Sequence, residues 1–242
     1  VEKCIFSIIN HFISIRLELC ANLMEGGTTP TVGMLKVIKQ YVRIPVFVMI
    51  RPRGGDFLYD EEELEVMKQD ILELKAAQAD GFVFGILKIP FPATFHRAID
   101  MCMNPLKELE KIIRIGFTRV LTSGGANTAL DGTPTPMQTQ FLFLSLSLSL
   151  TSACFLVFCL TFSLIFHPGG GISSRNLERI LRDTGAKEFH CSARSSQNSQ
   201  MNFRKDGISM GAALSPPEFS IKTTDSSKVQ QLVEMATAIW DL

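Results

Sequence analysis

Five polar residues with the chemistry of acids, bases and anion clamps stand at or just past the ends of apolar, strand-like runs. They are Glu18, Arg51, His96, Thr122 and Arg194. The carboxyl ends of parallel strands meet at one edge of a sheet, so we expect these side chains around one mouth. His96 can serve as a general acid or base, and Arg51 can hold a carboxylate or a phosphate. The pattern makes Glu18, Arg51 and His96 candidate catalytic residues acting on a small anionic substrate. A merely hydrogen-bonded, structural His96 is the alternative.

A glycine-rich loop adds the capacity to bind an anion. Gly169, Gly170 and Gly171 follow an apolar segment, and a helical pattern begins near Ser174. Backbone N–H groups and the start of a helix favour an anion, and many barrels bind phosphate at a late strand in this way. Glycine also occurs in tight turns, so the loop indicates an anion site only in combination with Arg194. We therefore predict an anion site at these three glycines and Arg194.

Soft-metal chemistry is the second possibility that the residue types offer. Glu18 and Cys20 lie two apart on one strand and share a face, so both point into a barrel if one of them does. Thiolates suit Cu(I), although a buried free cysteine often serves only as a small apolar residue. His190 and Cys191 are adjacent on one strand and point to opposite faces. They cannot both bind one ion in the mouth without a bulge.

Strand-like and helix-like segments alternate along the chain and must position these residues. Continuous apolar or strand-like runs occur at 16–20, 46–50, 81–86, 92–97, 119–125 and 187–194. Apolar residues at helical spacing occur at 31–42, from Asp60 to Leu74, and at 104–116, 173–185 and 226–240. Alternation of this kind indicates a parallel α/β protein. We predict one domain over residues 1–242, a TIM (β/α)8 barrel that is incomplete or locally disrupted.

Two irregularities limit that prediction. The first lies between Ile86 and Pro92, where two buried strands follow each other too closely. Parallel neighbours need a crossover of at least roughly ten to twelve residues. Either a segment is missing near residue 88, or a strand skips across the sheet.

The second irregularity is FLFLSLSLSLTSACFLVFCLTFSLIF, residues 141–166, a run of 26 residues without a charge. More than roughly 20 apolar residues normally indicate a transmembrane helix. However, Leu-Ser alternation has period two, and no Trp/Tyr belt or basic flank stands close by. A CT repeat in DNA is translated as alternating Leu and Ser, and pyrimidine tracts precede splice acceptor sites. We expect residues 137–166 to be an atypical apolar insert, much of it derived from an intron, in place of a helix and a strand. A membrane span and a genuine buried segment are the alternatives.

The composition excludes some partners and compartments. Lys and Arg together number 24, as do Asp and Glu, so there is no basic excess to suggest a nucleic-acid partner. Six cysteines are scattered without C-x-x-C spacing, and the N-terminal residues contain no cleavable signal pattern. We therefore expect reduced thiols in the cytoplasm and no membrane partner, unless residues 141–166 form a true span.

Several motifs carry a resemblance to a known family. They include RLELCANLMEGGTTP, IRPRGGDF, ATFHRAID, PGGGISSRNLERIL and EFHCSAR. In this order the motifs resemble the CutC copper homeostasis family in its vertebrate form, over residues 16–136 and 168–242. The chain departs from the family over residues 5–15, near Lys88 and in the apolar insert. The resemblance implies a TIM barrel, Cu(I) binding, a homo-oligomer, and a place in the cytoplasm and the nucleus.

The resemblance also implies metal ligands. In the family, cysteines of the first two strands are the plausible copper ligands. Cys20 matches the second strand, and Cys4 matches the first through a Glu-x-Cys pattern alone. We therefore expect Cu(I) at Cys20 and Cys4. No reaction is implied, so activity at the barrel mouth is left open.

Overall fold

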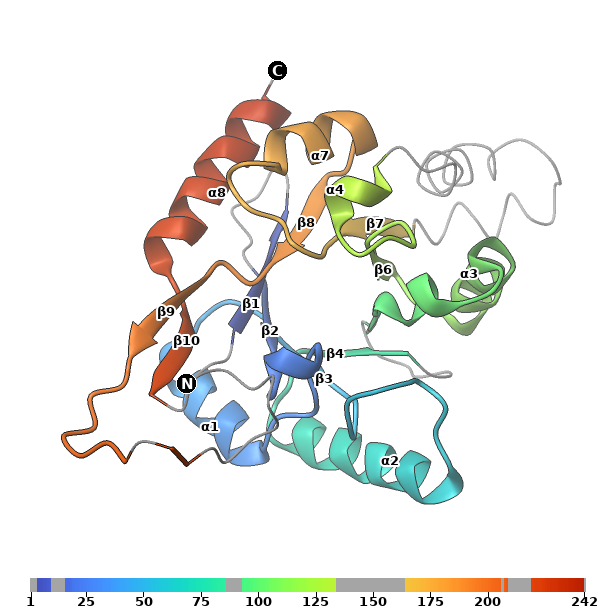
Figure 1. Ribbon diagram of the computed structural model, residues 1–242. Coiled ribbons are helices and arrows are strands. Elements are labelled where there is room, and N and C mark those ends of the chain that lie inside the picture. Colours follow the sequence, from blue (N-terminus) through green and yellow to red (C-terminus); the bar gives the residue numbers. More distant parts are fainter. Residues whose placement is uncertain are drawn as a thin grey trace, which may run out of the picture.

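The computed structural model (Figure 1) describes residues 16–85, 93–133, 164–205, 207–208 and 219–241, with the backbone alone for residues 4–9 and for Leu106. The fold is built on an eight-stranded sheet with strand order β7-β6-β5-β4-β3-β2-β1-β8. The strands are β1 (Cys4–Ile9), β2 (Arg16–Leu19), β3 (Val46–Met49), β4 (Gly81–Phe84), β5 (Ala93–Phe95), β6 (Arg119–Thr122), β7 (Ile165–Pro168) and β8 (Glu188–Cys191).

The sheet curls into a barrel. Every pairing from β2 through β7 is parallel. The two ends of the sheet meet through a parallel bridge between Gly169, directly after β7, and His190 of β8. The structure thus has the α/β, TIM-like architecture expected from strand–helix alternation, with a local disruption.

The disruption lies at β1, which is not part of the parallel run. β1 pairs antiparallel with both β2 and β8. Only residues 10–15 separate β1 from β2, whereas a parallel crossover takes a dozen or more residues. A link this short joins antiparallel neighbours, and so the first strand of the predicted (β/α)8 barrel is reversed.

The short link after β4 has a different outcome. β4 and β5 are direct parallel neighbours, so no strand is skipped. Residues 85–92 join them, fewer than a helical crossover needs, and residues 86–92 lie outside the described part of the chain. An extended chain of this length spans about 26 Å, which suffices to return along strands of three or four residues.

The end of the predicted apolar insert belongs to the barrel. Ile165 and Phe166 begin β7, and Phe166 and Leu164 pack against the core. The last residues of the segment 137–166 therefore fill a strand position between β6 and the seam. The rest of that segment, up to residue 163, lies outside the described residues.

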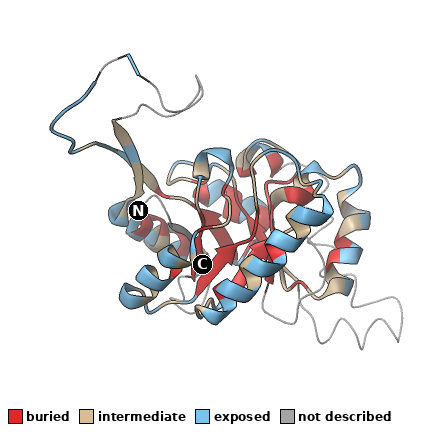
Figure 2. Ribbon diagram, turned by 90° about the horizontal axis from the view of Figure 1, so that it is seen from below, coloured by how far each residue is buried: buried red, intermediate tan, exposed pale blue. Residues whose placement is uncertain are grey.

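Helices cover the outside of the sheet, with exposed outer faces around buried strands (Figure 2). They are α1 (Val32–Tyr41), α2 (Glu61–Ala76), α3 (Pro105–Ile115), α4 (Ala129–Gly132), α7 (Leu177–Thr184) and α8 (Ser226–Trp240), with the short 3₁₀ helices η1 (Leu23–Glu25) and η2 (Arg97–Met101). Asp60 caps α2 and forms a reciprocal capping box with Glu63. Helix α7 begins later than predicted, because residues 173–176 form a turn before it. Among the helices described, none combines the length and the apolar character needed to cross a membrane.

A hairpin that the sequence did not predict projects from the barrel. β9 (Arg194–Asn198) pairs antiparallel with β10 (Ser220–Thr224). In Figure 2 this arm stands away from the layer of helices. It leaves β8 at the mouth and returns the chain to α8.

Side chains alternate between the barrel interior and the helix layer. Leu17 and Leu19 of β2 join the large cluster that packs against the helices, whereas Cys20 joins an inner cluster with Phe47, Met49 and Val83. The alternation follows from the period of two along a strand. It also places Glu18 and Cys20 on the inner face, as their spacing predicted.

The floor of the barrel is ionic. Glu188 at the start of β8 accepts from Arg119 at the start of β6, with Nε and Oε2 3.1 Å apart. Arg16 at the start of β2 lies 3.9 Å from the same carboxylate and stacks over the Phe47 ring. Three strands thus contribute buried charges to one cluster beneath the mouth.

Candidate functional site

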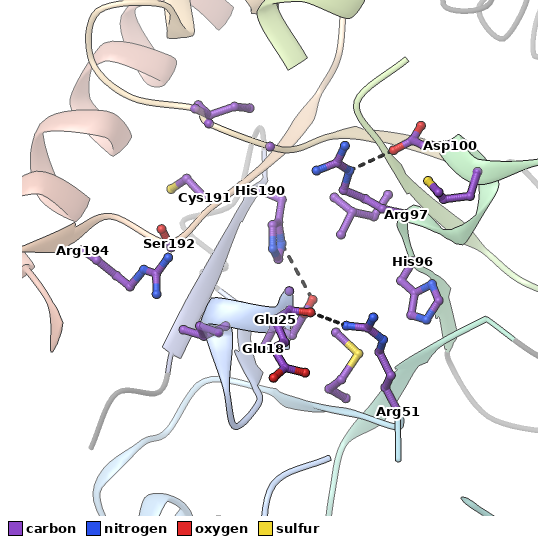
Figure 3. A pocket seen from close by; sticks show the side chains of 18 of the residues that line it. Glu18, Glu25, Arg51, His96, Arg97, Asp100, His190, Cys191, Ser192 and Arg194 are labelled. Carbon is purple, nitrogen blue, oxygen red and sulfur yellow. Dashed lines mark hydrogen bonds and ion pairs between the residues drawn. The ribbon is translucent and has the colours of Figure 1, made fainter. Parts of the chain in front are cut away.

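A cavity of about 410 Å³ opens at the carboxyl ends of the barrel strands (Figure 3). It is lined by six of the residues that the sequence predicted: Glu18, Arg51, His96, Gly170, Gly171 and Arg194. In Figure 3, Arg194, Ser192 and Cys191 lie on one side, His96 and Arg97 lie opposite, and His190 lies between them. Of the five polar residues expected at one mouth, Glu18, Arg51, His96 and Arg194 line the cavity and Thr122 does not, and the roles of all five stay predictions.

Glu18 is a buried carboxyl group that faces the cavity. It is 3% exposed, and among the described residues no hydrogen bond to its carboxylate is seen. Burial raises the pKa of Glu18 to about 7, against an opposing effect of the Arg16 charge. His190 Nδ1 lies 3.8 Å from Glu18 Oε2, beyond ordinary hydrogen-bond distance. Burial lowers the pKa of His190 to about 3, so the histidine is neutral at pH 7 and Glu18 exchanges its proton in this range.

His96 is oriented by its own helix. Its Nδ1 accepts a hydrogen bond from the Ala98 N–H at 3.1 Å, and its ring packs 4.8 Å from the Phe57 ring. Burial, together with the Arg51 charge, lowers the pKa of His96 to about 4. A neutral ring that accepts at Nδ1 carries its proton on Nε2. His96 therefore offers a ligand a hydrogen-bond donor, whereas a base would need Nε2 unprotonated.

Arg51 is buried and already engaged by the loops around it. Its Nη1 donates to the carbonyl oxygens of Glu25 at 2.6 Å and Gly27 at 3.1 Å. Its Nη2 donates to the Gly55 carbonyl at 2.8 Å, and the guanidinium lies over the Phe57 ring. Within the described part of the chain, Nε has no partner. Arg51 holds the loops after β2 and β3 together and presents its charge to the cavity.

Asp100 organises the wall opposite Arg194, and the sequence argument missed it. Its carboxylate accepts from Arg97 Nε at 2.9 Å and from the backbone N–H groups of Ser123 at 2.9 Å and Gly125 at 3.1 Å. The Thr122 hydroxyl donates to it as well. Thr122, predicted as a mouth residue, thus serves this network. A sequence signal for this role was present, because Asp100 follows Arg97 by three residues in the first turn beyond a strand.

The glycine-rich loop turns sharply at the mouth. Gly170 and Gly171 have φ values of +110° and +70°, which side chains rarely adopt. A Cβ on Gly170 would lie 3.1 Å from Arg97 Nη1, so this arginine packs directly against the loop. Gly169 lies deeper, beside Leu121 and His190, and bridges the barrel seam. Glycine is needed here for both conformation and close approach.

Cys20 lies beneath the cavity. It is fully buried directly after β2, under the loop that contains Gly27. A Cβ built on Gly27 would lie 3.4 Å from Cys20 Sγ and 3.5 Å from Met49 Cε. The thiol and the thioether side chain therefore flank one point, and Met49 also lines the cavity. The sequence reading missed Met49 as a soft partner, although it lies on the inner face of β3.

The other cysteines are less favourably placed to bind a metal ion beside Cys20. The register places Cys4 opposite Leu19, one residue before Cys20, but its side chain lies outside the described residues. Cys191 packs with the cluster under α7 and α8, and burial raises its pKa to about 12. His190 and Cys191 both line the cavity, so the predicted opposite orientation of the two neighbours stays a prediction. The described residues include no group of three or more His, Cys, Asp and Glu that could hold a metal ion.

Comparisons with known proteins give a consistent result. The CutC family model matches residues 4–90 and 88–139. The mouse copper homeostasis protein cutC homolog is 47% identical over 238 residues, which is 91% of this chain and 81% of that protein. The human copper homeostasis protein cutC homolog is also 47% identical, over 93% of this chain and 82% of that protein.

A solved structure is similar as well. The crystal structure of the putative copper homeostasis protein CutC from Streptococcus agalactiae superimposes with a TM-score of 0.56 at 32% identity. The match covers 74% of this chain and 89% of that chain. Sequence and structure comparisons thus agree on the same family.

Proposed function

The chain belongs to the CutC family, and from this premise we propose that it is a copper homeostasis protein that binds Cu(I) through the thiolate of Cys20. Its mammalian relatives are named copper homeostasis proteins. Cu(I) is a soft ion that selects thiolate and thioether ligands. The copper ion is cargo in this proposal.

The sulfur pair at the barrel mouth is the observation that carries the proposal. Cys20 Sγ and the terminal methyl of Met49 flank the same point beside Gly27, and both residues are buried. A buried thiolate and thioether exclude water and harder ions, which supports a site selective for Cu(I). Cys4 is included as a further thiolate on the family resemblance alone, since its register partner is Leu19 and not Cys20.

Anaerobic titration of Cu(I) against a competing chelator tests this proposal. We expect Cys20→Ala to abolish competition with the chelator and Met49→Leu to weaken affinity about tenfold, because Leu keeps the volume but lacks sulfur. Cys102→Ala is the matched control: this half-buried thiol lies outside the mouth and donates to the Ala98 carbonyl. Affinity unchanged by Cys20→Ala would remove this residue from the site.

We further propose that the protein acts in the cytoplasm and the nucleus as a homo-oligomer. The projecting hairpin supports the oligomer, because apolar side chains are exposed on it. Met201 and Phe203 follow β9, and Ile221 lies in β10. Sedimentation of the chain and of Phe203→Ser tests this part. A monomer at micromolar concentration would contradict it, and microscopy of a tagged chain tests the location.

A further inference from the structure

The turn after β7 carries backbone donors that the protein leaves unused. The N–H groups of Gly171 and Ile172 donate to no acceptor seen among the described residues, whereas Gly169 N–H bonds to the Thr122 carbonyl and the Gly169–His190 bridge engages Gly170. Gly170, Gly171 and Ile172 all line the cavity. Successive free N–H groups at a glycine turn suit an anion, although the turn alone would not establish a site.

Two arginines approach this turn from opposite sides. Arg97 is held by Asp100 and the Ser123 hydroxyl through its Nε and Nη2, which leaves Nη1 against Gly170. Arg194 lines the cavity on the other side, and its guanidinium makes no hydrogen bond or ion pair with any described residue. The turn and the two cations therefore surround one region of the mouth.

A second cavity, of about 650 Å³, meets the first at this region. Gly171, Ile172, Ser192 and Arg194 line both cavities. The lining of the second cavity adds three cationic side chains and no acidic one: Arg175, Lys222 and Lys228. Their combined potential favours a ligand with more than one negative charge.

Glu18 supplies the independent observation. Its carboxyl group is 3% exposed, faces the cavity and has no hydrogen bond to a described residue. A buried polar group without a partner is costly and uncommon in native structures. His190 connects the two ends of the cavity, since its ring lies beside Glu18 and its Cβ lies 3.2 Å from the Cβ position of Gly169. The carboxyl group, whose contact with His190 is 3.8 Å long, is therefore placed to receive a hydroxyl group of a ligand.

We propose that the barrel mouth binds a small phosphate monoester. The phosphate lies at the turn Gly170–Ile172 between Arg97 and Arg194, and the hydroxylated organic part reaches Glu18. A carboxylate has two oxygens, whereas a monoester dianion has three non-bridging oxygens for the N–H donors of Gly171 and Ile172 and for two guanidinium groups. The phosphate is held by residues other than Cys20 and Met49, although Met49 lines the same cavity, so the proposal extends the proposed copper function without resting on it.

Calorimetric titration of the full chain at fixed ionic strength tests the proposal. The probes are glycerol 3-phosphate, inorganic phosphate and glycerol. We expect glycerol 3-phosphate to bind at least tenfold more tightly than inorganic phosphate, because its hydroxyl groups reach Glu18. Glycerol alone should not bind. Absence of saturable binding of glycerol 3-phosphate at millimolar concentration would overturn the proposal.

Two variants separate the ends of the ligand. Arg194→Gln should weaken both phosphates about tenfold, whereas Glu18→Leu should weaken only glycerol 3-phosphate. Arg43→Gln is the charge-matched control, since Arg43 is exposed before β3 at the opposite end of the barrel. Circular dichroism checks that each variant is folded. If Arg194→Gln does not fold, Arg194→Lys is used in its place.

The outcomes are distinct. Equal weakening by Arg43→Gln and Arg194→Gln would reduce the effect to net charge and overturn the site. Glycerol 3-phosphate affinity unchanged by Glu18→Leu would overturn the placement of the organic part. Titration of Cys20→Ala should give unchanged phosphate affinity, so loss of the copper site and loss of the anion site are separate results.

Discussion

Single residues at the mouth differ from their ordinary chemistry because the barrel buries them. The sequence pointed to His96 as the acid or base, but burial lowers the pKa of His96 to about 4 and its Nδ1 is already engaged. Glu18 has the pKa nearest neutrality, about 7. The type and position of each residue were predictable, whereas its protonation depends on neighbours that only the closed fold assembles.

The raised pKa of Glu18 predicts a pH-dependent cost in stability. The unfolded carboxyl ionises near pH 4.5 and the folded one near 7. The stabilising effect of the bound proton is thus complete below pH 4.5 and is lost as pH rises to 7, by up to about 3 kcal/mol. Glu18→Gln does not titrate, so its stability relative to the parent chain should increase across this window. Urea denaturation at pH 4.5, 6 and 7.5 measures the difference. Glu62→Gln on exposed α2 is the control, and a difference independent of pH would contradict the prediction.

The position of His96 depends on the absence of a side chain at Gly85. A Cβ on Gly85 would overlap His96 Cε1. We expect Gly85→Ala to cost about 1–3 kcal/mol, because the ring must move in a packed site. Gly33→Ala in the first turn of α1 is the matched control: its nearest neighbour would be 3.8 Å away, and Ala there should stabilise by about 0.5–1 kcal/mol. Denaturant midpoints give both values, and equal effects would refute the steric explanation.

The elements that local sequence specifies were predicted well. Asp60 begins α2, Asn104 and Gly116 bound α3, and Gly185 ends α7, each through a cap within a few residues. The direction of β1 and the hairpin β9–β10 were not predicted. Strand pairing depends on link length and on distant partners, so apolar patterning alone does not reveal it.

The strands also meet at the ionic floor. We therefore expect removal of a buried carboxylate there to cost more stability than removal of an exposed one. Glu188 is 2% exposed and faces both Arg16 and Arg119. Glu188→Ala leaves buried cations without a counter-charge and should cost about 3–5 kcal/mol. Glu178→Ala removes an exposed pair with Arg182 and should cost less than about 1 kcal/mol. Thermal denaturation of both variants tests this, and similar losses would contradict a structural role for the floor.

At the scale of the whole molecule, the parallel barrel and the gathering of polar groups at its mouth were predictable from strand–helix alternation. The sulfur pair was not, because Cys20 and Met49 meet only where β2 and β3 pair. Apolar patterning also did not separate residues 165–166, which begin β7 and pair with β6, from the apolar run before them. Patterns reveal periodicity, whereas contacts between distant segments require the fold.

The intron hypothesis gives a prediction for the transcript. Because residues 164–166 belong to the barrel, the extra codons should end before residue 164. We expect a spliced message that lacks the Leu-Ser codons within 137–163. Sequencing complementary DNA across codons 131–175 measures this, and a message that retains every codon would contradict the hypothesis.

The reversed β1 has a consequence for synthesis on the ribosome. Strands β2 to β7 can each dock on the one before as the chain emerges, because each pairs with its predecessor. β8 alone joins the newest strand to the oldest hairpin. A nascent chain that stops before residue 188 therefore exposes two open sheet edges, which attract other chains. Completion of β8 is therefore the step that closes the open sheet into a barrel and removes both exposed edges.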